Sequence, residues 1–451
     1  MLRLGARGSG LGFDSGLTTD IHMFRSATLL VLGLSVVAIA AQKQPPSNAM
    51  TGLAERYVQT VLALGQHDAD YVDAFYGPAA WKEAASKTKI DLDTIATRAA
   101  GLRKELAAIP AGGTELERLR HQYLDRQLAS LEARVRMLKG ELLSFDEESR
   151  ALYDAVAPTL PASHFQAILD KLEKRFPGEG SLSVRYDRWR QPFVIPTARL
   201  DAVFKIAIDA CRERTLKHIK LPAGESFTVE KVTGKSWSGY NWYQGNYRSL
   251  IQVNTDLPIY VDRAIDLACH EGYPGHHVYN VLLEQHLVRD RGWVEFTVYP
   301  LFSPQSLIAE GTANFGIEMA FPGRERIAFE KSVIFAAAGI DPARADEYYE
   351  VQALVEQLAY AGNEAARAYI NGQATAGGAA MLIEKYALYA PDRARQRVRF
   401  IDQYRSYVIN YNLGKDLVRR YIESRAGGDS RRRWAEFGGL LSSPRLPSGL
   451  Q

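Results

Sequence analysis

Six successive stretches between residues 50 and 220 carry apolar residues at helical spacing, and this pattern constrains the fold more than any other feature. In the longest stretch, Leu119, Tyr123 and Leu128 fall on one apolar stripe. Ser144 and Glu147 have the spacing of a capping box and predict a helix start. Amphipathic helices bury their stripes against one another, so we predict a helical scaffold. The predicted helices cover Ala54–Leu64, Leu92–Ile109, Leu116–Leu138, Glu147–Val156, His164–Phe176 and Ala198–Ile219.

The pattern changes near residue 226. Phe227–Val232 and Ser249–Asn254 are typical of strands, and an aromatic, glycine-rich run, Trp237–Tyr247, lies between them. Helical periodicity resumes near Pro258 and continues almost to the end of the chain. We therefore predict a mainly α fold, a large helical domain with one small β-sheet beside the active-site helix. Its helical N-terminal part covers residues 42–225 and its catalytic part 226–440, folded together as one domain, with a tail over 441–451.

Composition narrows the classes of partner and of metal site. Lys and Arg number 55 against 52 Asp and Glu, a balance that argues against nucleic acid or an anionic membrane as the partner. The two cysteines, Cys211 and Cys269, are too few for a disulfide scaffold or a cysteine-based zinc finger. The sequence leaves open whether they form one disulfide, because it does not place the two sulfur atoms. Any metal site must therefore use histidine and carboxylate ligands.

The beginning of the chain has the form of an export signal. Arg25 is followed by an apolar run, Ala27–Ala41, that is short for a membrane span, and Ala38–Ala40 offers a small-x-small cleavage site. We predict a start at Met23, with residues 1–41 comprising an upstream extension and a signal peptide. The mature protein would be periplasmic or extracellular, without stable membrane association. The alternative is an uncleaved N-terminal anchor.

Three of the nine histidines lie within residues 270–277, whose sequence is HEGYPGHH. A zinc peptidase helix usually carries H-E-x-x-H, which places two histidines one turn apart and a glutamate beside the metal-bound water. Here Pro274 stands at the position of the second histidine, so that pattern is not met. A helix broken at Pro274 and Gly275 would let a later histidine approach His270. The spacing does not decide whether His276 or His277 is the second histidine ligand. We favour His276, because it needs less shortening of the helix to reach His270.

A second predicted helix supplies the third ligand. Glu310 lies in the segment Ile308–Phe315, where small residues allow close approach to the first helix. Glu318, two turns further on, is the fallback ligand. Asn314, one turn after Glu310, could hydrogen-bond a ligand histidine and so support the site.

The two segments together carry a resemblance to a known family. HEGYPGHH, followed by EGTAN at residues 310–314, resembles the bacterial domain-of-unknown-function 885 family, whose pattern is H-E-x-x-P-G-H-H with a later E-G-x-A. The family looks like the helical zinc metallopeptidases of the glutamate-zincin type, and the resemblance covers most of the mature chain. The resemblance implies a zincin-like fold with Zn²⁺ as cofactor. It also implies that the zinc ligands are His270, Glu310 and either His276 or His277, and that Glu271 is the general base.

Two departures from the family pattern concern the substrate side. Thr312 stands where members often have an aromatic residue, and their P-G-Q-A-L-x-Y segment appears here only as Val408–Gly414. These departures leave the substrate preference open. Helical peptidases commonly bring a late tyrosine to the zinc to donate to the developing oxyanion, which makes Tyr407 and Tyr411 candidates.

Further candidates would contact the substrate itself. Arg405 could bind a substrate carboxylate, although an ion pair within the protein is the alternative. Tyr240 and Asn241, in the aromatic run, would line the substrate site beside an edge strand that aligns an extended peptide; the alternative is packing of the sheet.

These features predict an exported zinc-dependent metallopeptidase that acts on peptides, with Glu271 as general base. The first alternative is a non-catalytic metal- or peptide-binding protein on a peptidase fold. Glu271 argues against it, because a purely structural zinc needs no base. The second alternative, a dinuclear iron protein, requires Glu-x-x-His pairs, and none lies around the histidine cluster.

Overall fold

The apolar stripes of the N-terminal part form helices whose ends are set by their caps. The computed structural model describes residues 48–450, so the predicted signal peptide and the start at Met23 lie outside the described residues. Ser144 and Glu147 exchange both hydrogen bonds of a capping box. Ser144 is thus the N-cap, which starts the helix at Phe145 instead of Glu147, and Asp154 ends it in a left-handed conformation. The helices of this part are α1 (Asn48–Leu64), α2 (Ala79–Lys87), α3 (Leu92–Ala108), α4 (Glu115–Leu138), α5 (Phe145–Tyr153), α6 (Ala162–Arg175), α7 (Leu182–Arg190) and α8 (Leu200–Leu216).

Helices also dominate the second half of the chain, which confirms the mainly α fold with a small sheet. The three-stranded sheet has the order β2-β4-β3, with β2 parallel and β3 antiparallel to β4. Its strands are β2 (Ser226–Val232), β3 (Gly239–Gly245) and β4 (Arg248–Asn254). The later helices are α9 (Arg263–Leu267), α10 (His276–Leu283), α11 (Pro304–Ala320), α12 (Arg324–Phe329), α13 (Phe335–Ala338), α14 (Ala345–Glu356), α15 (Ala361–Ile370), α16 (Ala376–Tyr386), α17 (Pro391–Tyr404), α18 (Ile409–Ala426) and α19 (Ser430–Leu441).

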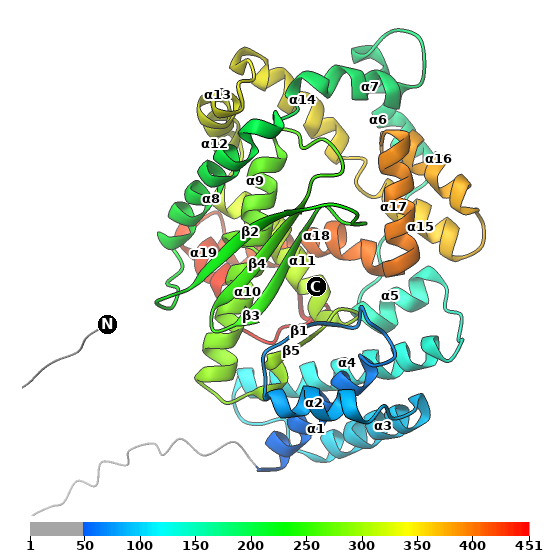
Figure 1. Ribbon diagram of the computed structural model, residues 1–451, viewed down its shortest axis with the longest axis vertical. Helices are drawn as coiled ribbons and strands as arrows, with labels where there is room; N and C mark the ends of the chain where they lie inside the picture. Colours follow the sequence, from blue (N-terminus) through cyan, green and yellow to red (C-terminus); the bar gives the residue numbers. More distant parts are fainter. Residues whose placement is uncertain (1–47, 451) are drawn as a thin grey trace, which may run out of the picture. The chain divides into compact units, whose positions relative to one another are not determined.

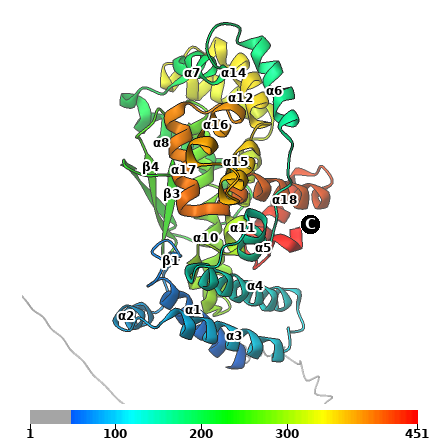
Figure 2. The same ribbon diagram turned by 90° about the vertical axis from the view of Figure 1, so that its right-hand side faces the viewer.

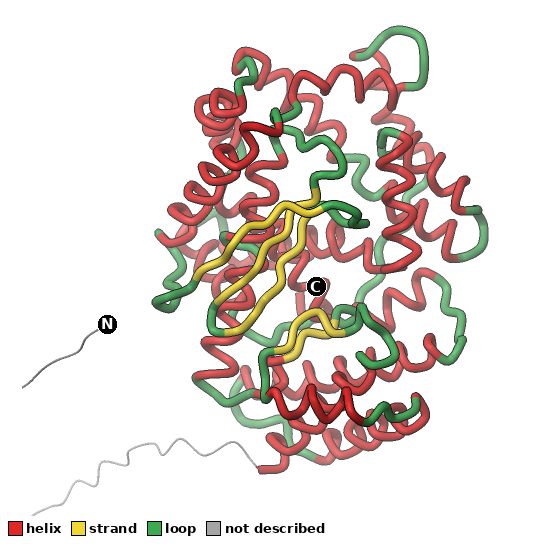
Figure 3. Tube along the Cα trace, in the orientation of Figure 1, coloured by secondary structure: helices red, strands yellow, loops and turns green. Residues whose placement is uncertain are grey.

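A second, two-stranded sheet was not expected from the sequence. It pairs β1 (Val72–Phe75) with β5 (Val298–Pro300), two segments far apart in the chain. Figures 1 and 3 show this pair between the three-stranded sheet and helices α1–α4. Besides β5, β1 lies against β3 of the three-stranded sheet.

Helix α11 lies at the centre of the described chain (Figures 1 and 2). Residues on every face of it are buried, as expected for a helix enclosed on all sides. It touches α18 through glycine: a Cβ added at Gly311 would lie 2.5 Å from the carbonyl carbon of Gly414. Toward the segment 270–277, a Cβ added at Gly316 would lie 3.1 Å from the Cγ of Pro274. Small residues on α11 therefore permit the close approach that its central position requires.

Cys211 and Cys269, whose pairing the sequence left open, form a disulfide with a Cα–Cα distance of 5.7 Å. The bond ties α8 to the residue that precedes His270. Between residues 48 and 450, no helix has both the length and the apolar character needed to cross a bilayer.

The glycine contact between α11 and α18 generates a stability prediction. We expect Gly311→Ala to lower the free energy of unfolding by about 1–3 kcal/mol, because the added methyl group meets backbone that has no room to move. Urea unfolding measures the difference.

Gly101→Ala is the matched control. Gly101 lies inside α3 with nothing within 4 Å of an added Cβ. The same substitution should there raise the free energy of unfolding by about 0.5–1 kcal/mol, the difference in helix propensity. Equal effects at the two sites would contradict the close packing of α11 on α18.

Candidate metal centre

The segment 270–277 doubles back on itself through a break between two helices. After α9 the chain makes a π-helical turn over Ala268–Gly272, and α10 begins at His276. The peptide bond before Pro274 is cis. The Gly275 amide donates to the Cys269 carbonyl at 2.9 Å, and a Cβ on Gly275 would lie only 1.9 Å from the His270 carbonyl oxygen. Only glycine fits there, and the break brings His276 next to His270.

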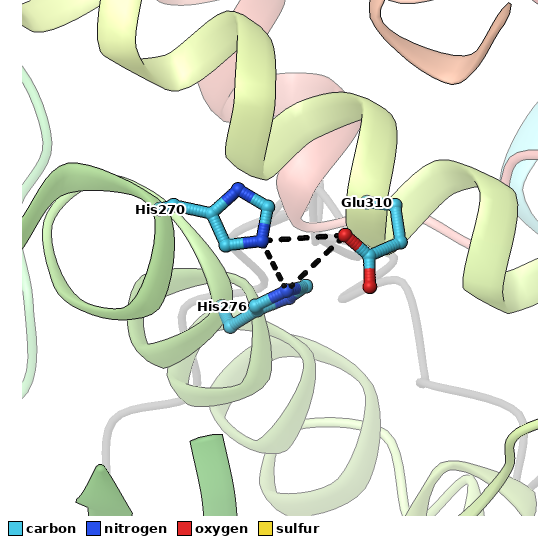
Figure 4. A group of neighbouring side chains, drawn as sticks. All are labelled: His270, His276 and Glu310. Atoms are coloured by element: carbon cyan, nitrogen blue, oxygen red, sulfur yellow. Dashed lines mark hydrogen bonds and ion pairs between the residues drawn. The ribbon is translucent and has the colours of Figure 1, made fainter. Parts of the chain in front are cut away.

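Three side chains converge at this point (Figure 4). His270 Nε2 lies 3.1 Å from His276 Nε2 and 3.3 Å from Glu310 Oε2, and His276 Nε2 lies 3.7 Å from the same oxygen. Atoms bound to one tetrahedral zinc at roughly 2.0–2.1 Å lie about 3.3–3.4 Å apart. The three atoms therefore have the spacing of one face of such a tetrahedron.

Among residues 48–450, no lysine or arginine pairs with the carboxylate of the cluster, whose Oε2 faces only the two histidines. Glu310 is buried, and its Oε2 accepts no hydrogen bond from residues 48–450. Two imidazole nitrogens 3.1 Å apart need a proton or a metal ion between them. Imidazole and carboxylate donors suit zinc, and these three residues would leave the fourth position of a tetrahedral site without a ligand from the described residues.

The charges of the cluster shift its pKa values in opposite directions. Burial by itself would raise the pKa of Glu310, but His270 and His276 outweigh it and hold that pKa far below its usual range. Burial would lower the pKa of His276, but Glu310 outweighs it and raises that pKa to about 9. The pocket thus favours positive charge at the point where the two histidines meet.

Glu271 lies beside the cluster as a buried carboxylate, with Oε2 unpartnered among the described residues. Burial raises its pKa, and the neighbouring His270 and His276 lower it in part. Gly239 of β3 makes room for it, since a Cβ there would lie 2.6 Å from Glu271 Oε1. A buried carboxylate with a raised pKa and a free oxygen is suited to accept a proton.

His277 turns away from the cluster. The side chain is fully buried, with Nδ1 2.9 Å from Ser249 Oγ and Nε2 3.0 Å from Glu225 Oε2. Glu225 also accepts from the Tyr273 hydroxyl and pairs with Arg212. Both ring nitrogens are thus occupied, and His277 anchors the first turn of α10 to β4 and to the segment before β2.

The late tyrosines and Asn314 reach the cluster in different ways. The Tyr407 hydroxyl donates to Glu310 Oε1 at 2.8 Å, so it fixes the carboxylate of this candidate ligand. Tyr411 is half-buried, and its hydroxyl makes no hydrogen bond within the described chain; burial and the charge of Glu310 raise its pKa. Asn314 donates to the backbone carbonyls of Glu310 and Tyr411, so the expectation that it bonds a ligand histidine is not met.

Two predicted charged residues are engaged elsewhere. Arg405 Nε pairs with Glu148 Oε2 at 2.6 Å, which is the ion-pair alternative. Glu318, the fallback ligand, pairs with Arg419 and Lys415. Neither belongs to the cluster.

One further candidate residue, Asp73 of β1, was missed by sequence reasoning. Its carboxylate accepts a hydrogen bond from the Tyr240 hydroxyl. The pKa of Asp73 is raised to about 6. Burial is the largest cause and the charges of Glu310 and Glu271 add to it, whereas the Tyr240 hydrogen bond and the positive charge of His276 oppose it. No local motif marks this position, because only the pairing of β1 with β5 brings it to the site. Asn241, the neighbour of Tyr240, donates to the Glu271 carbonyl at 2.8 Å.

Comparisons with known proteins leave the function open. No protein-family model matches the sequence. No curated protein matches it. Among solved structures, the chain is similar to a "putative lipoprotein" from Colwellia psychrerythraea, with 14% identity over 80% of this chain and 66% of the other, and a TM-score of 0.47. It is also similar to a "putative lipoprotein of unknown function" from Shewanella oneidensis, with 14% identity over 82% and 75% of the two chains and a TM-score of 0.43. Both TM-scores lie below 0.5, and neither likeness supports a function for this chain.

The geometry generates a prediction that separates the two adjacent histidines. We expect His276→Ala to abolish stoichiometric zinc binding, because it removes one of three ligands. His277→Ala should retain about one zinc per chain but lower the free energy of unfolding by about 1–3 kcal/mol, since buried Ser249 and Glu225 each lose a partner.

Metal analysis after reconstitution and urea unfolding measure the two effects. Full zinc content in His276→Ala together with loss in His277→Ala would reverse the assignment.

Proposed function

We propose that this protein is a zinc-dependent metallopeptidase. The observation that carries the proposal is the meeting of His270, His276 and Glu310 at 3.1–3.7 Å, with the unpaired carboxylate of Glu271 beside them. This donor set and neighbouring base are those of hydrolytic zinc sites with two histidines and one glutamate. The resemblance of the two motifs to the domain-of-unknown-function 885 family supports the same activity.

The chain's own residues divide the work of peptide hydrolysis. Zinc, when bound, supplies Lewis acidity toward the scissile carbonyl and lowers the pKa of water. Glu271 accepts the proton of the attacking water and later delivers it to the leaving amine. Tyr411 keeps its proton and is free to donate a hydrogen bond to the developing oxyanion. Tyr407 holds Glu310 by its other oxygen.

Glu271→Gln tests the role of the base. We expect zinc content to persist while turnover of a peptide library falls by about 10²- to 10⁴-fold, because the amide keeps the shape of the side chain but cannot accept the proton. Metal analysis and peptide hydrolysis, each repeated after chelation, are the measurements.

Glu318→Gln is the matched control, because it removes a carboxylate on α11 that is already paired with Arg419 and Lys415. It should retain both zinc and turnover. Loss of zinc in Glu271→Gln would make Glu271 a ligand. If the zinc-loaded wild-type protein showed no turnover, the peptidase proposal would be wrong and the protein would be a non-catalytic metal-binding protein.

We also propose that the chain is exported and that its signal ends near Ala40. The support is the apolar run Ala27–Ala41 with its small-x-small end. N-terminal sequencing of the exported protein should find a start near Ala41. A start at Met23 in the membrane fraction would identify the segment as an anchor.

A further inference from the structure

A cavity of about 600 Å³ lies against β1 and β3. Its wall includes Asp73 of β1, Trp237, Tyr240 and Trp242 from β3 and the loop before it, and Tyr404 at the end of α17. Tyr240 connects the cavity with the cluster, because the residues on either side of it contact Glu271: a Cβ on Gly239 would lie 2.6 Å from Glu271 Oε1, and Asn241 donates to the Glu271 carbonyl at 2.8 Å. Since the Tyr240 hydroxyl donates to Asp73, a ligand group held at Asp73 would lie on the side of the cavity that adjoins Glu271.

Asp73 is a carboxylate without a cation. Among residues 48–450, no lysine, arginine or histidine nitrogen lies within 4.0 Å of it, and Tyr240 is its hydrogen-bond donor. A carboxylate removed from bulk water and left without a positive partner is unfavourable. The cavity thus offers a negative group that a cationic ligand would complete.

Aromatic rings around the carboxylate suit the same kind of ligand. The ring centroids of Trp237 and Tyr240 lie 5.3 Å apart, and those of Tyr240 and Trp242 lie 4.5 Å apart, which makes a continuous aromatic row along one wall. The faces of such rings attract ammonium groups and exclude water from the ion pair.

We propose that Asp73 binds a primary ammonium group of the peptide substrate, and that this group is the free N-terminus. The enzyme is then an exopeptidase that acts near the amino end of short peptides. This inference rests on the proposed peptidase function and adds the feature of the substrate that the site selects. Tyr240 orients the Asp73 carboxylate by its hydrogen bond, and the ammonium takes the remaining acceptor positions.

The test uses the zinc-loaded Glu271→Gln protein, which binds peptides without cutting them. Calorimetry compares one short peptide with a free N-terminus and the same peptide N-acetylated. We expect acetylation to weaken binding by about 10- to 100-fold, the usual worth of a hydrogen-bonded charge. This comparison changes only the ligand, so it does not depend on the folding of a further variant.

Variants at the cavity then locate the effect. When Asp73→Asn is added to the Glu271→Gln protein, the ratio of the affinities for the free and the acetylated peptide should fall to near one, with zinc content unchanged. Asp70→Asn is the matched control, because Asp70 lines the same cavity but already accepts hydrogen bonds from Gln403. It removes the same charge and should leave the ratio intact.

The remaining outcomes are decisive as well. Binding that returns when an N-acetylated peptide carries lysine at its first position would overturn the assignment to the N-terminus, because a side-chain ammonium would then occupy the site. Equal binding of the free and acetylated peptides would overturn the inference. The inference would also be overturned if amidation of the peptide C-terminus, and not acetylation of its N-terminus, weakened binding. That result would point to Lys235 or Arg399 in the cavity wall as the group that binds the peptide. Turnover by the wild-type protein is measured separately, so the inference and the peptidase proposal can fail independently.

Discussion

The contact between Gly275 and the backbone of His270 is the constraint on which the site depends. A regular helix would carry His270 and His276 to poorly matched faces, because six residues are more than one and a half turns. The chain instead leaves the helix after Gly272 and returns so closely that no side chain fits at Gly275. Two histidines of one short segment can then face one carboxylate from α11. A backbone break thus places two histidines of HEGYPGHH side by side, as a single helical turn does in H-E-x-x-H.

The second constraint is the balance of buried charge. Glu271, Glu310 and Asp73 bring three carboxylates into one region, and none of them pairs with a lysine or arginine of the described chain within 4.0 Å. The two histidines offset this charge only when they are protonated. A divalent metal at His270, His276 and Glu310 and an ammonium at Asp73 would together balance the region. The two proposals therefore follow from one electrostatic requirement and address different carboxylates.

The sequence predicts the helices, the small sheet and the residues of the cluster better than it predicts the contacts between segments that lie far apart in the chain. Helical periodicity and capping boxes are local, so α3, α4 and α5 could be placed within a few residues. The choice between His276 and His277 is not local, because it depends on Ser249 and Glu225, which occupy the ring of His277 from the sheet region. Asp73 was missed for the same reason: its position depends on the pairing of β1 with β5, across more than 200 residues of chain. The Cys211–Cys269 disulfide likewise needed the packing of α8 on the turn before His270.

The N-terminal helices take part in the site through a chain of hydrogen bonds. Glu148 of α5 is almost fully buried and accepts hydrogen bonds from the Arg405 side chain and from the amide and hydroxyl of Ser406. These bonds hold the turn between α17 and α18, where the next residue, Tyr407, donates to Glu310 Oε1. That bond leaves Oε2 directed at the two histidines. The carboxylate on α5 therefore positions the candidate ligand on α11 through one short turn, which is why a helical part remote in sequence from the motif belongs to the same folded unit as the candidate metal centre.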